Sequence, residues 1–376
     1  VATRFAARDG QARLRTSFAA LAALAMMSLA IATLLTQTAL TLALALTVLG
    51  AAALDRRFTL PPLAYFVQVG VIVLGYRLVV DPGVTWAYDA PIVEVLAAYG
   101  GTIAALIFAL WLLLPLPRRA TKIVLETGIM ADTSILASLL LTRALVQAGG
   151  ENFATSYWGL SLQALVWFFV AFAQFDRMRA GGPLRRVRRI LGIVFACVGA
   201  VPMLAAMTLA NPLMDWAEPV LGPVVFNTLM VAYLLPAVLF WLASRRLGAP
   251  GGWPRKALVG VAAALAALWL ALTIRHVWQG PILSSGQVLQ AEHFSYTIAM
   301  LLVGAGLLYQ SIARASTTLR RAALVVIGMS VAKVFLVDMP GLSGLTRVSS
   351  LMALGLALAG LAWLNRWAAE QSEDAD

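Results

Sequence analysis

The stretch IVEVLAAYGGTIAALIFALWLLLPLPRRATK, residues 92–122, decides the fold class. Residues 92–115 are almost wholly apolar, and a helix of about 20 such residues crosses the roughly 30 Å hydrocarbon core of a bilayer. Arg118, Arg119 and Lys122 follow at once. An apolar run that ends in a short basic loop is typical of a membrane-spanning helix that leaves the bilayer on the cytoplasmic side.

The composition of the whole chain agrees with this stretch. Of the 376 residues, 61% are hydrophobic and 12% are charged, and the mean hydropathy is +0.86. Soluble domains are about 45–50% apolar and about 25% charged, so the composition excludes a soluble enzyme. The one cysteine, Cys197, excludes a disulfide framework and a cysteine-built zinc site.

Apolar runs long enough to cross a bilayer recur along the chain. A window of about 20 residues finds about twelve of them. The expected spans are 16–35, 37–54, 62–80, 92–115, 122–147, 156–175, 187–209, 222–243, 256–275, 291–312, 321–337 and 345–365. The fold class is therefore an all-α, polytopic membrane helical bundle with short loops.

The basic residues are concentrated in alternate loops. Twenty-three of the 28 Lys and Arg residues lie before the first span, after the last one, or in every second loop between them, and the other loops are acidic or neutral. This bias places both termini in the cytoplasm. It also explains the net charge of +11 without nucleic acid as a partner. We expect a basic segment at 1–15, one transmembrane domain at 16–366, an acidic tail at 367–376, and a bacterial inner membrane as the location.

Five basic residues fall near the outer ends of expected helices. They are Arg77, Arg143, Arg275, Lys333 and Arg347. Charge at membrane depth is costly, so it is usually buried, paired or functional. One interpretation is a cationic site for an anionic headgroup or solute. The other is that these charges pair with Asp81, Glu292 and Asp338, or extend to the interface, and only fix helix ends.

The expected helix 122–147 carries two carboxylates. Glu126 lies about one turn inside the cytoplasmic boundary, and Asp132 lies near the midplane. A carboxylate at this depth suits proton or cation coupling in a transporter, and it also suits a hydrogen-bonded structural role. Gly100-Gly101, Pro202 and Pro236 interrupt apolar runs, as helix breaks do around transporter sites.

The two histidines form a weak metal candidate. His276 ends one expected helix and His293 begins the next, so a hairpin could bring both beside Glu292. No second shell is recognisable, and we expect neither a metal nor another cofactor. The nucleotide-binding loops and the nucleophile elbow of hydrolases do not occur in the sequence.

The last quarter of the chain resembles a known family. Its residues are Gln290-Ala-Glu292-His-Phe-Ser295-Tyr296, Leu319-Arg320-Arg321, Lys333-Val-Phe-Leu-Val-Asp338, Gly344-Leu-Thr-Arg347-Val-Ser-Ser350 and Leu354-Gly355-Leu. This run, within 290–366, resembles the C-terminal part of the domain-of-unknown-function family 2339, which comprises bacterial multi-pass membrane proteins. The resemblance implies a bacterial inner-membrane protein and a family motif at Lys333, Asp338 and Arg347. Family members are commonly longer, which agrees with a chain that begins at Val1 rather than at Met.

Three hypotheses for the function remain open. The first is transport or handling of an anionic lipid or envelope solute, with anionic phospholipid as the expected partner. The second is an accessory or scaffold subunit that packs in a larger membrane complex through small-residue helix faces. The third is a membrane-embedded transferase that acts on a lipid-linked substrate, although the sequence favours a protein that is not an enzyme.

Overall fold

A computed structural model describes residues 13–35, 37–179, 185–214, 218–247, 252–284 and 286–338, with isolated positions between 348 and 363. In this part of the chain the regular structure is entirely helical. The expected last span, 345–365, the tail at 367–376, and Arg347 lie outside the described residues or are reached only at those isolated positions.

The helices follow one another with short connections. The α-helices are α2 (Arg13–Leu34), α3 (Gln37–Phe58), α4 (Leu63–Val79), α5 (Gly83–Asp89), α6 (Ile92–Val95), α7 (Gly101–Leu113), α8 (Arg119–Gly149), α9 (Glu151–Thr155), α10 (Tyr157–Arg179), α11 (Arg185–Met207), α12 (Leu235–Leu247), α13 (Trp253–Gln279), α14 (Gln290–Ala313) and α15 (Thr317–Lys333). Three π-helical segments interrupt or extend them, η1 (Leu96–Gly100), η2 (Met230–Leu234) and η3 (Val334–Asp338).

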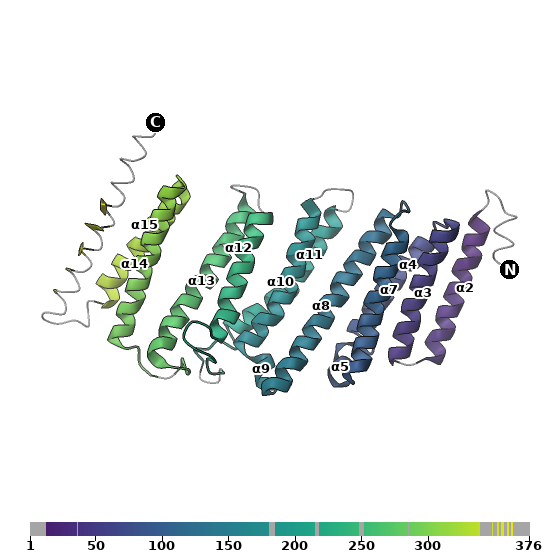
Figure 1. The fold of residues 1–376 in the computed structure, drawn as a ribbon, viewed down its shortest axis with the longest axis horizontal. Helices are drawn as coiled ribbons and strands as arrows, with labels where there is room; N and C mark the ends of the chain where they lie inside the picture. Colours follow the sequence, from purple (N-terminus) through teal and green to yellow (C-terminus); the bar gives the residue numbers. More distant parts are fainter. Residues whose placement is uncertain are drawn as a thin grey trace. The chain divides into compact units, whose positions relative to one another are not determined.

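The chain forms two compact units. Unit 1 comprises Val1–Asn211 and Val231–Ala264, and unit 2 comprises Pro212–Met230 and Leu265–Asp376. Unit 1 therefore contains α2 to α12 and the first part of α13, while unit 2 contains the end of α13 together with α14 and α15 (Figure 1).

Length and composition make the protein a polytopic membrane protein. Within the described residues, nine helices are long and apolar enough to cross a bilayer, or ten if α4 and α5, which are bent by 51°, count as one span. Each expected span up to residue 337 overlaps a described helix. Helix α15 has 17 residues, which reach only about 25 Å at 1.5 Å per residue. Large apolar side chains face outward, as a lipid solvent requires.

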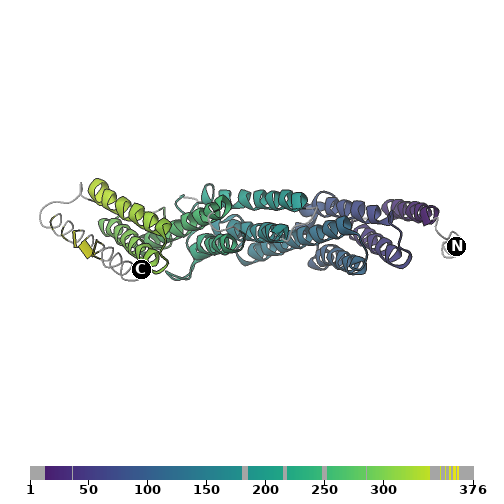
Figure 2. The same ribbon diagram turned by 90° about the horizontal axis from the view of Figure 1, so that it is seen from above.

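Unit 1 is held together by side-by-side packing of its helices. Helix α3 packs against α4 and α7, α8 packs against α4, α7 and α10, and α10 packs against α11 and α12 (Figures 1 and 2). Small residues permit close approach, because a Cβ at Gly101 of α7 would lie 2.4 Å from the Leu42 side chain of α3. Of the Gly100-Gly101 pair, Gly101 therefore serves the packing of α3 against α7, whereas a Cβ at Gly100 would meet nothing within 4 Å.

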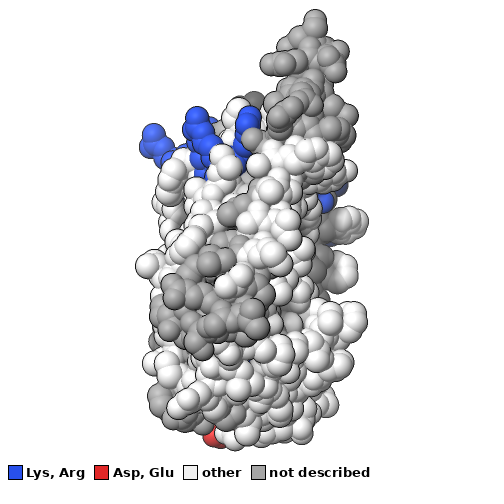
Figure 3. All heavy atoms as spheres, turned by 90° about the vertical axis from the view of Figure 1, so that its left-hand side faces the viewer, with Lys and Arg blue, Asp and Glu red and all other residues white. Residues whose placement is uncertain are grey.

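Basic residues gather at one end of the helices, which is called the basic end below, and the other end is called the opposite end. Within unit 1, the last turns of α3, α10 and α12 carry Arg56, Arg57, Arg177, Arg179, Arg245 and Arg246. Figure 3 shows Lys and Arg side chains at one end of the face in view and a small acidic spot at the other. At the basic end of unit 1, the Arg118 guanidinium donates to both carboxylate oxygens of Asp55, at 2.9 and 3.0 Å. These hydrogen bonds raise the pKa of Arg118 above its ordinary value, so the guanidinium stays charged.

One expected span, 222–243, begins later than the sequence suggests. Gly222 has φ +99, a left-handed conformation that glycine adopts without strain. The Asn227 side chain then caps the helix, since its Oδ1 accepts a hydrogen bond from the Met230 amide at 3.1 Å. Apolar residues 222–226 are thus a connection rather than the first turns of a helix, and hydropathy alone does not distinguish the two.

The start of α12 shows how a helix break is compensated. Pro236 has no amide hydrogen, so the carbonyl of Ala232 loses its partner four residues on. The Ser161 hydroxyl of α10 donates to this carbonyl. Both Ser161 and Ala232 are fully buried, and the proline break is therefore satisfied from the neighbouring helix.

Candidate functional site

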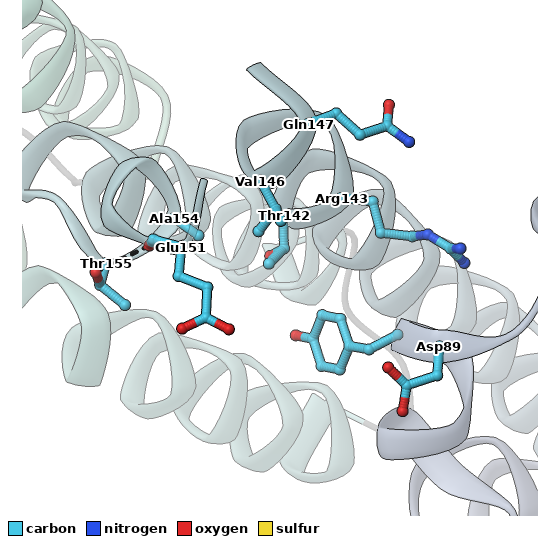
Figure 4. Close-up of a pocket in the computed structure, with 9 residues that line it drawn as sticks. Asp89, Thr142, Arg143, Val146, Gln147, Glu151, Ala154 and Thr155 are labelled. Carbon is cyan, nitrogen blue, oxygen red and sulfur yellow. Dashed lines mark hydrogen bonds between the residues drawn. The ribbon is translucent and has the colours of Figure 1, made fainter. Parts of the chain in front are cut away.

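A pocket of about 450 Å³ opens at the opposite end of unit 1, between α5, α8 and α9. Its lining is mainly polar or charged, and it consists of Tyr88, Asp89, Thr142, Arg143, Val146, Gln147, Glu151, Ala154 and Thr155. In Figure 4, Asp89 and Glu151 project their carboxylates toward the pocket from α5 and α9. Ligand pockets typically have volumes of about 300–1,000 Å³, so the pocket has room for a small polar molecule.

Arg143 lines this pocket but is bound to the protein backbone. Its Nη1 donates to the carbonyl of Ala87 at 2.9 Å, and its Nη2 donates to that of Ala90 at 2.6 Å. These carbonyls belong to the last turn and the cap of α5, where carbonyls lack partners within the helix. Arg143 therefore attaches the end of α5 to α8 and forms one wall of the pocket.

A row of residues leads from the pocket along α8 toward the basic end. It consists of Thr142, Ser138, Ser134, Met130 and Glu126, spaced four apart, and is called the polar row below. Residues at this spacing form one ridge on a helix surface. Sixteen steps of 1.5 Å give the row a length of about 24 Å, most of the thickness of a bilayer core.

Helix α10 faces the polar row with polar side chains of its own. Gln163 Nε2 donates to the Ser138 carbonyl at 3.1 Å and to the Thr142 hydroxyl. Gln174, eleven residues or about three turns further on, donates to the Met130 sulfur at 3.4 Å. The Ser138 hydroxyl is buried and has no hydrogen-bond partner within the described residues. The interface between α8 and α10 is thus polar at Gln163 and at Gln174, and between these two places Met130 and Ala131 of α8 pack against Val170 and Ala171 of α10.

The polar row ends in a charged group at the basic end. Glu126 Oε2 lies 3.4 Å from Arg177 Nη1 and 3.4 Å from Arg188 Nη2. Arg188 also donates to the carbonyl of Arg177 at 2.8 Å. Glu126 therefore joins α8 to α10 and α11 and is partly exposed.

Asp132 lies on a different face of α8. Its residue is 2% exposed, and the described residues provide it with neither a hydrogen bond nor an ion pair. It interacts electrostatically with Tyr99, whose hydroxyl donates to the Leu78 carbonyl at 2.6 Å. Tyr99 belongs to η1, and π-helical turns frequently mark functional sites. Glu126 and Asp132 are therefore not neighbours, and they face different helices.

Arg77 connects two helices of unit 1. Its Nη1 lies 3.5 Å from Asp81, four residues on, and its Nε donates to Thr41 of α3 at 3.5 Å. The Asp81 side chain is 70% exposed, so this ion pair lies at the surface. The geometry is that of a charge that fixes the end of α4 to α3.

In unit 2, Glu292 is fully buried and accepts three side-chain hydrogen bonds. They come from Arg275 at 3.3 Å, Gln279 at 2.9 Å and Tyr296 at 2.9 Å, and these four residues are called the Glu292 cluster below. Arg275 also donates to the Leu283 carbonyl at 2.6 Å. The cluster therefore joins α13, α14 and the loop between them.

The remaining predicted residues of unit 2 lie near this cluster. Lys333 of α15 donates to the carbonyl of His293 at 2.9 Å and to the Thr297 hydroxyl at 2.8 Å, and Asp338 ends η3. His276 Nδ1 lies 2.9 Å from the Gly280 carbonyl. In the described part of the chain, no three His, Cys, Asp or Glu side chains form a group that could hold a metal, so His276, Glu292 and His293 do not assemble as one.

The predicted cations thus belong to different groups. Arg77 and Arg143 are in unit 1, Arg275 and Lys333 are in unit 2, and each described one is bonded to the protein itself. Sequence reasoning missed the pocket carboxylates, the Asp55–Arg118 pair, and the role of Gln163 and Gln174. The spacing of four along α8 and of eleven between the two glutamines could have revealed the α8–α10 interface.

The family comparison agrees with the resemblance read from residues 290–366 and extends it over the chain. The family described as Predicted membrane protein (DUF2339) matches residues 1–367, and the chain belongs to this family. Neither the search of curated proteins nor that of solved structures gave a match.

Proposed function

We propose that this DUF2339 protein transports or handles a small polar solute of the bacterial envelope through unit 1. In this proposal it lies in the inner membrane with its basic end in the cytoplasm, as the positive-inside rule requires. The solute enters the pocket between α5, α8 and α9 from the side of the membrane that faces the opposite end of the helices. It then meets the polar row at Thr142, which both lines the pocket and begins the row.

The polar row is the observation that carries this proposal. A helix pair whose only task is to pack in lipid gains nothing from buried polar groups that lack partners, because each costs free energy. The unpartnered Ser138 hydroxyl lies one turn from the pocket residue Thr142, and Gln163 donates to the carbonyl of Ser138 rather than to its hydroxyl. Water or solute that reaches this position would supply the missing hydrogen bond.

Asp132 and Glu126 have separate roles in this proposal. Asp132 is the buried carboxylate that could carry a coupling proton or cation, because the described residues compensate it with no opposite charge. Glu126 is held between Arg177 and Arg188 and closes the basic end of the row. An Asp132→Asn variant that folds normally and moves solute at an unchanged rate would remove the coupling role but leave the pathway.

Thiol accessibility tests the pathway without knowledge of the solute. Cys197, which is exposed on α11, is first replaced by serine. Single cysteines are then placed at Thr142, Ser138 and Ser134 in protein reconstituted into vesicles. A membrane-impermeant maleimide is added from the opposite side. Because a thiol reacts as its thiolate, which forms only in contact with water, we expect labelling to fall from 142 to 138 to 134.

Phe169→Cys is the matched control. Phe169 lies in the middle of α10, and its side chain is exposed on the outer surface of unit 1, beside a mainly apolar hollow between α10 and α12 that lipid would fill. We expect Ser138→Cys to react at least about tenfold faster than Phe169→Cys. Equal and slow labelling of the two, in variants that elute as the parent does, would overturn the proposal. That result would favour a scaffold subunit whose charges only fix helix ends.

A further inference from the structure

The charge of the pocket indicates the chemistry of its ligand. Three charged side chains line it, namely Asp89, Arg143 and Glu151. Asp89 and Glu151 are exposed, and neither lies within ion-pair distance of a cation among the described residues. Figure 4 shows both carboxylates reaching into the pocket from opposite sides. The balance of formal charge is therefore negative, although the sequence predicts a site for an anion.

The guanidinium of Arg143 is already hydrogen-bonded to the protein backbone. Two of its N–H groups are directed at the carbonyls of Ala87 and Ala90, and a cation at a helix C-terminus is attracted by the partial negative charge there. An incoming phosphate or carboxylate would have to compete with these carbonyls and would also meet two carboxylates. Anion binding is thus opposed by geometry and by charge.

The end of α8 adds to the negative potential. This helix has 31 residues and ends at Gly149, beside the pocket residues Val146 and Gln147. The C-terminus of a helix carries the equivalent of about half a negative charge within its last turn. Tyr88 supplies an aromatic ring to the lining, and ring faces attract organic cations.

We infer that the pocket binds a ligand with an ammonium group, which Asp89 and Glu151 hold while the hydroxyls of Thr142 and Thr155 bind its polar remainder. This inference rests on the proposed function, because it names the class of solute that enters the same pocket. A metal ion fits less well, since two carboxylates leave most positions of a hard cation to water. The ammonium chemistry can come from a free amino alcohol or from the ethanolamine headgroup of a phospholipid.

Protection of a pocket thiol from alkylation tests the ligand class. Ala154 is a small, half-buried residue of the lining. Ala154→Cys in the Cys197→Ser protein is reconstituted into phosphatidylglycerol vesicles and alkylated with uncharged N-ethylmaleimide. The added probes are ethanolamine, ethylene glycol as its neutral analogue, and glycolate as its anionic analogue. We expect ethanolamine at about four times a Kd in the millimolar range to slow alkylation about fivefold, because protection follows the occupancy of the pocket, and we expect the other two to leave it unchanged.

A second arm distinguishes the two sources of the ammonium group. The same protein is placed in phosphatidylethanolamine vesicles with no probe added. Slower alkylation there than in phosphatidylglycerol identifies the lipid headgroup as a ligand, and protection by free ethanolamine alone identifies a soluble one. Either result supports the inference. Protection by glycolate overturns the inference. So does the absence of protection by every probe and by phosphatidylethanolamine vesicles.

The carboxylates are tested by their own variants. Asp89→Asn with Glu151→Gln should abolish protection by ethanolamine, because the amides retain size but lose charge. Glu94→Gln is the control, since Glu94 is an exposed acid on α6 that does not line the pocket. Persistence of protection in the double variant would also overturn the inference. If the polar row is labelled from the opposite side but no amine protects, the proposed function stands and only the ligand class fails.

Discussion

The pocket of unit 1 and the Glu292 cluster of unit 2 use similar side chains in opposite ways. In unit 2, a fully buried carboxylate receives hydrogen bonds from Arg275, Gln279 and Tyr296. In unit 1, the carboxylates of Asp89 and Glu151 face a pocket of about 450 Å³ without an ion-pair partner among the described residues. The carboxylate in unit 2 already has its hydrogen-bond partners within the protein. The carboxylates in unit 1 remain available to bind a charged ligand.

The comparison teaches that a charged side chain near a membrane boundary indicates function only when its hydrogen-bond and ion-pair partners are known. Arg143 and Arg275 looked equivalent in the sequence, as cations near the outer ends of helices. Arg143 donates to backbone carbonyls and leaves the nearby acids unpaired, whereas Arg275 donates to an acid and a carbonyl. Polar groups whose hydrogen bonds are all made within the protein stabilise the fold. Polar groups that can still form hydrogen bonds or ion pairs are the candidates for function.

The largest effect should come from breaking the Glu292 cluster. Glu292→Ala leaves the Arg275 guanidinium largely buried without its counter-charge, and the loss of one partner of a buried ion pair costs about 3–5 kcal/mol. The measurement is the free energy of unfolding in mixed micelles. Glu94→Ala, which removes an exposed acid, should change it by less than about 0.5 kcal/mol. Equal effects of the two would show that the cluster does not hold unit 2 together.

A smaller effect should follow from loss of the hydrogen bond that satisfies the break at Pro236. Ser161→Ala leaves the buried carbonyl of Ala232 without its donor, at a cost of about 1–3 kcal/mol. Pro236→Ala restores an amide hydrogen four residues after Ala232, so Ser161→Ala should cost less in that background. A double-mutant cycle on unfolding free energies measures the difference. Identical costs in both backgrounds would contradict the role given to Ser161.

The smallest effect separates two serines of the polar row. Ser134 donates to the Met130 carbonyl at 2.6 Å, while the Ser138 hydroxyl is buried without a partner. Ser134→Ala should destabilise by about 1 kcal/mol, and Ser138→Ala should be close to neutral, because the Ser138 hydroxyl has no partner in the protein and exchanges hydrogen bonds only with water. Thermal unfolding of both variants in one detergent gives the comparison. A larger loss for Ser138→Ala would show that its hydroxyl already has a partner in the resting protein.

Much of the fold could be predicted from hydropathy and charge, because the bilayer demands long apolar helices and biased loops. The ranges predicted for α8, α10 and α11 agree with the structure to within a few residues. The range 222–243 does not, because Gly222 and the Asn227 cap delay the helix. A local cap of this kind is invisible to an average over about 20 residues.

The candidate site was only partly predictable. Arg143 and Thr142 lie on α8, whereas Asp89 ends α5 and Glu151 begins α9, so the pocket depends on how α5 and α9 fold back on α8. Spacing within a helix is readable from sequence, but packing between helices is not. The same limit explains why the predicted cations seemed able to form one group.

The measurement that tests the account most directly is hydroxyl-radical footprinting of the unaltered protein in nanodiscs, read by mass spectrometry. Met130 of the polar row is partly buried, Met203 of α11 is 6% exposed within the same unit, and Tyr296 belongs to the Glu292 cluster. Because radicals form in water, the account predicts rapid oxidation of Met130 and protection of Met203 and Tyr296. Protection of Met130 to the same degree as Met203 would contradict a solvated path along α8, and with it the central claim.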